Sequence, residues 1–354
     1  MKKGIIFLKG IILACSLVLL FALGRWVFFN IIKQNSILDG LVSFREAVID
    51  DMESGKDTAV YYVKNVEKSD VHMINEYIDS AYGNVDTYRV ILESGDYLAI
   101  QLNFVLSDNY YVIRKYLHNE EIPADRPKAK EIYDVIKTFI DHNITLNMTD
   151  FDKEIAVHDY IIKNCVYGFP KDSDDAYTSY GVLVSKTGVC DGYAEAFFMF
   201  MSCLGIECDI VVGDTSEGLH AWNQIKLEDA WYHVDLTWDD SLPDMGTYVK
   251  HTYVNLDDDA IRQNHSWREQ FYNACTADKY NFYKKKFYYY SSYDDFAKGI
   301  RMQYGKSSVL EAAVEGLPDS PDLSFLFGNG GIRKVNYVIE DMGAYRIIVI
   351  YLNK

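Results

Sequence analysis

The stretch TGVCDGYAEAFFMFMSCLG, residues 187–205, places one cysteine between a glycine-bearing turn and a nearly continuous apolar run. The run has the length of a helix and is apolar almost all round, which is typical of a helix buried at the centre of a domain. We expect this helix to begin near Val189 or Cys190. Backbone N–H groups at a helix start are unpaired and stabilise negative charge, so this position favours a nucleophilic thiolate at Cys190. Gly188 and Gly192 are expected to let a substrate backbone approach the sulfur.

A cysteine needs a base before it can act as a catalyst, and two later segments offer one. His220 opens the segment HAWNQIKL, and Asp235 lies in AWYHVDLTW; both segments have the pattern of strands. If Glu228 and Asp229 form a two-residue turn between them, His220 and Asp235 lie on one face of a hairpin, within reach of each other. A loop with an odd number of residues would place them on opposite faces. The spacing therefore permits a histidine–aspartate pair without requiring it.

Two alternatives use some of the same residues. His233 is a competing base, because it lies on the same strand face as Asp235. We favour His220, since the same register places His233 farther along the hairpin. A zinc site made of Cys190, His220 and Asp235 is the other alternative, although no paired-ligand spacing such as CxxC supports it.

The expected reaction is nucleophilic attack on an amide. His220 takes the proton of Cys190 and later protonates the leaving amine, while Asp235 holds the imidazole in the useful tautomer. The product of this step is a thioester, which water or an amine then resolves.

Further residues are candidates for contacts with the substrate. The oxyanion is expected to be bound by the backbone N–H of Cys190 and by a second donor, for which we select Tyr180 in YTSYG. Trp222 and Trp238 either line the substrate groove or belong to the core.

The segments GVCDGYAEAF, LHAWNQI and WYHVDLTWDD, in this order, resemble the transglutaminase-like superfamily, particularly its bacterial members with a papain-like cysteine-peptidase core. The resemblance covers about residues 130–267. It implies an α+β fold, in which a central helix carrying the cysteine packs on an antiparallel sheet, and a catalytic triad of Cys190, His220 and Asp235. The sequence shows no calcium-site pattern like that of the animal cross-linking enzymes. We therefore expect no metal and no organic cofactor to be required.

The family contains protein cross-linkers, peptidases, deamidases and inactive members, so a shared fold does not determine the reaction. The first hypothesis is a thiol enzyme, either a cysteine peptidase or a transglutaminase-type acyltransferase, that acts on protein or peptide amides. The alternative is a catalytically silent module that binds or scaffolds other molecules at the cell surface.

The amino terminus carries an apolar run from residue 10 to residue 24, which extends through Arg25 to Ile32 and is preceded by Lys2, Lys3 and Lys9. This length suits a transmembrane helix, and the preceding lysines favour a cytoplasmic amino terminus. The rest of the chain is then extracellular. A cleaved signal peptide is the alternative, because residues 22–24 offer a small-x-small site.

The chain is expected to divide into four parts. These are an anchor (1–34), a small α/β domain (35–125), the transglutaminase-like core (126–278) and a small carboxyl-terminal α/β domain (279–354). The two small domains show a similar order of strand, helix, strand and strand, with a strand expected at residues 284–292 in the second. In the core, His158 on the expected helix 151–164 is interpreted as structural.

The overall charge limits the choice of partners. The chain has a formal net charge of −17 and no basic stripe, which argues against nucleic acid as a partner. Expected partners are a protein or peptide substrate, with a cell-wall peptide as one candidate, and the membrane that holds the amino-terminal helix.

Overall fold

The computed structural model describes residues 37–72, 80–94, 97–169, 174–240, 248–302, 308–327 and 331–353. The chain forms two compact units, one comprising Met1–Ile78 and Tyr82–Leu106 and the other Asp79–Ala81 and Ser107–Lys354. The predicted anchor, residues 1–34, lies outside the described residues. Within those that are described, no helix is long and apolar enough to cross a membrane.

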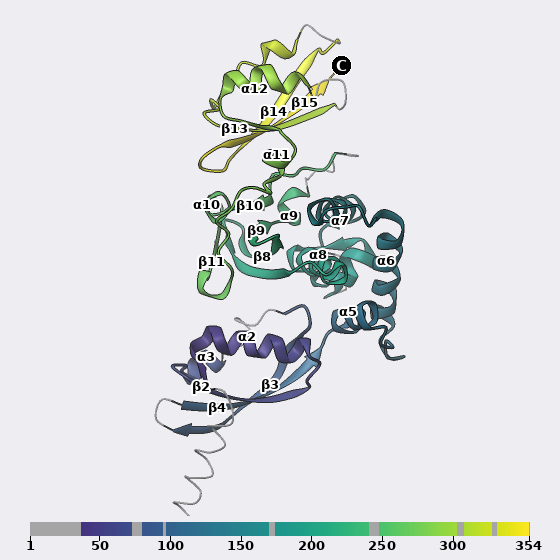
Figure 1. Cartoon of the computed structure of the whole chain (residues 1–354), viewed down its shortest axis with the longest axis vertical. Helices are drawn as coiled ribbons and strands as arrows, with labels where there is room; N and C mark the ends of the chain where they lie inside the picture. The colour runs from purple at the N-terminus through teal and green to yellow at the C-terminus, as the bar shows by residue number, and fades with distance from the viewer. Residues whose placement is uncertain are drawn as a thin grey trace, which may run out of the picture. The chain divides into compact units, whose positions relative to one another are not determined.

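The first unit is a small four-stranded sheet with helix α2 packed on it (Figure 1). The strand order is β1-β2-β4-β3, with β1 parallel to β2 and the other neighbours antiparallel. Val48 and Met52 of α2 are fully buried in one cluster with Ile100 and Leu102 of β4. The sequence predicts both β2 and the β3–β4 hairpin. The elements are β1 (Leu38–Asp39), α2 (Gly40–Glu53), β2 (Thr58–Lys64), α3 (Lys68–His72), β3 (Gly83–Ser94) and β4 (Tyr97–Leu106).

Helix α8 (Cys190–Leu204) carries the apolar run and is the central helix of the second unit. It packs on strands of the sheet on one side and on α5 and α7 on the other. Phe197, Met199, Phe200 and Met201 are fully buried, as expected for a helix that is apolar all round. The other helices here are α5 (Asp108–His118), α6 (Pro127–Asn143), α7 (Asp150–Asn164), and the short helical turns 174–177 and 181–185.

The sheet of the core is antiparallel and has the strand order β10-β9-β8-β7-β11. Leu227 pairs with Ala230, so residues 228 and 229 form the two-residue turn that the sequence predicts. The strands are β7 (Cys208–Thr215), β8 (Gly218–Leu227), β9 (Ala230–Val234), β10 (Val254–Leu256) and β11 (His265–Trp267). They are joined by α9 (Leu236–Asp239), α10 (Asp258–Ile261) and the turn Glu269–Phe271, while β5 (Val166–Tyr167) pairs with β6 (Thr187–Gly188). The result is a mixed α+β core of the expected kind.

The carboxyl-terminal part of the second unit forms another four-stranded sheet, in the order β12-β13-β15-β14. Its first pair is parallel and the others are antiparallel, so its topology repeats that of the first unit. The strand predicted at residues 284–292 is largely wrong, because Asn281 caps a short helix there and only Tyr289–Tyr290 are extended. The elements are α11 (Phe282–Lys285), β12 (Tyr289–Tyr290), α12 (Tyr293–Gly299), β13 (Val309–Val314), β14 (Lys334–Asp341), β15 (Arg346–Asn353), and the turns Ile300–Met302 and Ser324–Leu326.

Candidate active site

Cys190 is the first residue of α8, after Val189 in an extended conformation at the N-cap. The sulfur is thus carried by the helix end whose N–H groups have no partner within the helix. Cys190 is partly exposed and lines a cleft, whereas Cys165, Cys203 and Cys275 are buried. Cys190 therefore combines access to solvent with a site that favours negative charge.

The two glycines beside Cys190 serve packing within the chain. A Cβ atom at Gly192 would come within 2.6 Å of the Ala176 carbonyl oxygen, and one at Gly188 would come within 2.4 Å of the Val182 side chain. Both glycines thus allow the segment before β6 to press against the start of α8. The prediction that they admit a substrate backbone is corrected, since the chain itself takes up this space.

His220 and Asp235 meet as the hairpin register permits. His220 Nε2 lies 2.7 Å from Asp235 Oδ2, and Asp235 is completely buried. Asp235 follows β9 and is the N-cap of α9, where its Oδ1 accepts a hydrogen bond from the backbone N–H of Trp238 at 3.1 Å. The sequence places Asp235 within the strand; the strand instead ends one residue earlier because Asp235 caps a helix. This cap fixes the carboxylate that faces His220.

The protonation of His220 follows from its neighbours. Burial lowers the pKa of His220, but the charge and hydrogen bond of Asp235 and a hydrogen bond to Cys190 outweigh it and raise the pKa to about 10. Burial would raise the pKa of Asp235, yet His220 and His265 together hold it well below its usual range. At neutral pH the pair is therefore an imidazolium beside a carboxylate. Since Nε2 faces Asp235, the other ring nitrogen remains for Cys190.

A second histidine binds the same carboxylate oxygen. His265 Nε2 lies 3.0 Å from Asp235 Oδ2, and His265 Nδ1 lies 2.6 Å from the side-chain oxygen of Asn264. The sequence analysis did not identify His265 as a site residue, although it lies in the histidine-bearing segment NHSW. Nothing in its local spacing shows that β11 joins the sheet at the edge of β7.

The competing base His233 is engaged elsewhere. The indole N–H of Trp222 donates to His233 Nδ1 at 3.0 Å, so Nε2 carries the proton that faces Asp258 at 2.9 Å. Burial outweighs the opposing effect of Asp258 and lowers the pKa of His233. His233 is thus a buried neutral histidine of the core.

The two tryptophans have different positions. Trp222 is fully buried and its ring lies nearly parallel to that of His220, with the centroids 5.9 Å apart. Trp238 is partly exposed and lines the cleft, with its ring 6.0 Å from that of His220. Of the two residues considered for the groove, the structure places Trp238 in its lining and Trp222 in the core behind His220.

Tyr180 points away from this cleft. Its hydroxyl donates to Glu131 of α6 at 3.1 Å, and Lys128 lies over its ring. The prediction of an oxyanion donor at Tyr180 is therefore corrected. Tyr167 lies closer to the sulfur: it lines the cleft, and burial first and then the charge of Cys190 raise its pKa.

The cleft has a volume of about 590 Å³ and is bounded by both parts of the second unit. The core contributes Cys190, His220 and Trp238, and the carboxyl-terminal sheet contributes a wall from β14 and β15. The carboxylates of Glu217, Asp240 and Glu340 and the ammonium group of Lys250 also line the cleft. Lys250 Nζ lies 3.0 Å from Glu340 Oε1. The other lining residues are Tyr167, Thr215, Leu219, Thr237, Val338, Val349 and Tyr351.

Comparisons with known proteins find similarity in the middle of the chain. Residues 137–236, which include Cys190, His220 and Asp235, match the model of the transglutaminase-like superfamily. Kyphoscoliosis peptidase from Homo sapiens is 28% identical over 111 residues, which are 27% of this chain and 17% of that protein. Its counterpart from Mus musculus is 32% identical over 84 residues, 20% of this chain and 13% of that protein. The chain thus spans less than a fifth of the length of these relatives.

Two solved structures share lower similarity. One, described as a crystal structure of a TGase, is 14% identical with a TM-score of 0.28, over 60% of this chain and 61% of that one. A putative cysteine protease from Cytophaga hutchinsonii is 11% identical with a TM-score of 0.27, over 51% of this chain and 72% of that one. The family match therefore shows similarity to the transglutaminase-like superfamily over residues 137–236.

Proposed function

We propose that this transglutaminase-like domain is a thiol enzyme that attacks protein or peptide amides through a thioester on Cys190. The observation that carries the proposal is the arrangement at the cleft: a partly exposed thiol at a helix start lines the same cleft as His220, and the buried carboxylate of Asp235 lies 2.7 Å from that imidazole. A core cysteine without function needs none of these features.

The reaction follows from the protonation states. The sulfur of Cys190 attacks the carbonyl carbon, forming a C–S bond and an oxyanion beside the N–H groups of the helix start. The imidazolium of His220 gives its proton to the leaving nitrogen as the C–N bond breaks, and Asp235 keeps the ring in place. Water or an amine then attacks the thioester and releases the sulfur, with His220 acting as the base.

The lining of the cleft favours a cationic partner. Three carboxylates, Glu217, Asp240 and Glu340, line the cleft together with two cations, Lys250 and the imidazolium of His220, so these groups leave an excess of negative charge. An amine that approaches as an ammonium ion, or a basic side chain next to the scissile amide, is attracted to this surface. A peptide of the cell wall is a candidate substrate because the domain is expected to face outward.

The location of the enzyme is part of the proposal. The apolar run at residues 10–32 and the lysines before it support a single membrane anchor with the catalytic domain outside the cell. Digestion of intact cells with an added protease tests this, since it removes the domain only if the domain faces outward.

The experiment on activity uses a glutamine-bearing peptide and a labelled primary amine, with mass spectrometry of the products. We expect released ammonia, cleaved peptide or amine conjugate from the wild type, and none of them from Cys190→Ala. Turnover that persists in Cys190→Ala would refute the assignment. Absence of turnover together with a Cys190 thiol whose alkylation is independent of His220 would favour the silent binding module.

A further inference from the structure

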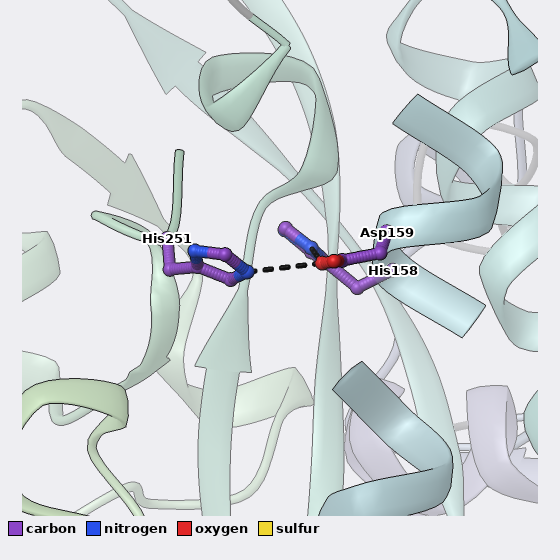
Figure 2. Close-up of side chains that lie close together, drawn as sticks. All are labelled: His158, Asp159 and His251. Carbon is purple, nitrogen blue, oxygen red and sulfur yellow. Dashed lines mark hydrogen bonds and ion pairs between the residues drawn. The ribbon is translucent and has the colours of Figure 1, made fainter. Parts of the chain in front are cut away.

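A second cluster of histidines and carboxylates lies away from the thiol, where α7 meets the segment before β10. His158 Nδ1 lies 3.3 Å from Asp159 Oδ1, and His251 Nε2 lies 2.9 Å from the same oxygen (Figure 2). His158 is completely buried, His251 is nearly so, and Asp159 is partly exposed. Two imidazole nitrogens and a carboxylate oxygen thus converge on one small volume.

The spacing of these three atoms suits a tetrahedral cation. They all lie within 4.8 Å of one another. Donor atoms on Zn²⁺ at the usual bond lengths of about 2.0–2.2 Å are about 3.3 Å apart, and two imidazoles that share the ion have ring centroids about 5 Å apart. The ring centroids of His158 and His251 are 5.2 Å apart. An ion therefore needs only small movements of the side chains.

The ring nitrogen of each histidine that faces away from Asp159, here called the outer nitrogen, is held by a carboxylate. Histidines that bind metals usually have such a partner. His158 Nε2 faces Asp239 Oδ2 at 3.3 Å, and His251 Nδ1 faces Glu311 Oε1 at 3.3 Å. A carboxylate on the outer nitrogen favours the tautomer that carries the ring proton on that side. The inner nitrogens face Asp159, and they bind a metal once they have lost their protons.

These outer carboxylates are themselves fixed. Asp239 accepts from the backbone N–H of Tyr253 at 3.1 Å, and Glu311 accepts from the hydroxyls of Tyr248 and Tyr283 at 2.9 and 3.2 Å. The ring of His251 also lies parallel to that of Phe282, with the centroids 4.0 Å apart. The orientation of each imidazole is thus determined before any ion arrives.

The second carboxylate oxygen of Asp159 and the nearby Glu154 also belong to the surroundings of this cluster. Lys163 Nζ lies 3.1 Å from Asp159 Oδ2, which leaves Oδ1 to face the two histidines. Glu154, one turn earlier on α7 and completely buried, has an oxygen, Oε1, without a hydrogen-bond partner among the described residues.

Among the described residues, two other clusters have comparable donors, and neither shares these features. In one, His220 and His265 flank Asp235 and belong to the active site. In the other, His233 Nδ1 already accepts a hydrogen bond from the indole N–H of Trp222, so its other nitrogen carries the ring proton.

We propose that His158, Asp159 and His251 form a binding site for a divalent transition-metal ion, with Zn²⁺ as the best fit and water as the fourth ligand on the exposed side of Asp159. The site is structural. It joins α7 of the core to the segment before β10, and through Glu311 on β13 to the sheet that forms one wall of the cleft. Zn²⁺ here takes no part in the thioester chemistry.

The test measures zinc uptake by the full chain after treatment with a chelator, by calorimetric titration with ZnCl₂ and by metal analysis of the protein. We expect the wild type to bind one ion per chain. His251→Ala should weaken binding by about 100-fold or more, and Asp159→Asn, which keeps the shape of the side chain, by about tenfold or more. Circular dichroism shows whether each variant is folded. If His251→Ala does not fold, zinc binding by Asp159→Asn decides the test.

Two controls separate this site from others. His142→Ala removes an exposed histidine of α6 and should leave zinc binding unchanged. Cys190→Ala removes the thiol, so unchanged binding there places the ion away from the active site. The proposal is overturned if the wild type takes up no zinc, if Asp159→Asn binds it as well as the wild type does, or if Cys190→Ala abolishes uptake. None of these results depends on whether the enzyme is active.

Discussion

Replacement of Asp235 by asparagine tests the electrostatics of the site, because it removes the charge that raises the pKa of His220 and keeps the shape. The pKa of His220 is about 10 with Asp235 present, against an ordinary value of 6.5. One pKa unit corresponds to about 1.4 kcal/mol, so the difference favours the imidazolium by roughly 5 kcal/mol. Without the carboxylate, only Cys190 opposes the effect of burial, and we expect the pKa of His220 to return to about its ordinary value of 6.5. At pH 7.5 the imidazolium population then drops from nearly complete to about a tenth.

The assay is the rate of alkylation of Cys190 by iodoacetamide between pH 5 and pH 10.5, with peptide mapping to separate it from the other cysteines. We expect Asp235→Asn to react at least about tenfold more slowly at pH 7.5, because the thiolate loses its cationic partner. Loss of turnover should be larger, on the order of 10²–10⁴, since orientation of the ring is lost as well.

Three control measurements complete this test. Cys190→Ala gives the background of the buried thiols, and His220→Ala should match Asp235→Asn in its loss of reactivity. Asp214→Asn removes a carboxylate from the neighbouring strand β7 and should behave as the wild type does. If the pH profiles of Asp235→Asn and the wild type coincide, the electrostatic reasoning is wrong.

Four further results are expected. The pKa of His220 is higher in the folded than in the unfolded chain, so its contribution to stability is complete below about pH 6.5 and is lost toward pH 10. Between these values, urea titrations should show that the free energy of unfolding falls more steeply with pH for the wild type than for Asp235→Asn, by roughly 1.4 kcal/mol per pH unit. Gly192→Ala should lower the free energy of unfolding by about 1–3 kcal/mol, since its Cβ meets backbone oxygens at 2.6 and 2.9 Å; an unchanged urea midpoint would contradict this packing. His265→Phe should lower the free energy of unfolding by about 1–3 kcal/mol, because the hydrogen bond to Asp235 is lost, and should slow the alkylation of Cys190 less than Asp235→Asn does. Equal losses of alkylation rate in the two variants would show that His265 matters as much as the carboxylate. Tyr351→Ala should raise KM for a peptide substrate by roughly tenfold and leave the alkylation rate of Cys190 unchanged, and an unchanged KM would exclude β15 from the substrate site.

The parts of the site that depend on local sequence could be predicted. The helix start at Cys190 follows from a glycine-bearing turn before an apolar run, and the two-residue turn at 228–229 sets the register that brings His220 toward Asp235. The capping role of Asp235 also has a local signal, since an aspartate before a short helical segment is a common N-cap.

The parts of the site that depend on segments distant in the sequence could not be predicted. His265 reaches Asp235 only because β11 joins the far edge of the sheet, and sequence spacing does not show this. The wall formed by Glu340 and Tyr351 likewise requires the docking of another sheet. Tyr180 was selected for its position before Cys190, but the contact with Glu131 turns it toward α6.

The shared topology of the two small sheets could be predicted only in part. The sequence shows a similar order of elements, although few residues are identical, and the strand orders β1-β2-β4-β3 and β12-β13-β15-β14 agree with each other. Side-chain packing in the two clusters differs, because α2 has 14 residues and α12 has 7. Topology is therefore preserved where the apolar pattern is kept, while the helix length varies.

The most direct test of the central claim is to trap the acyl-enzyme. The chain is mixed with p-nitrophenyl acetate, quenched in acid and mapped by mass spectrometry. The account predicts an acetyl thioester on Cys190, with strongly reduced yield in His220→Ala and none in Cys190→Ala. Acetylation confined to other residues, or an equal yield on Cys190 in His220→Ala, would contradict it.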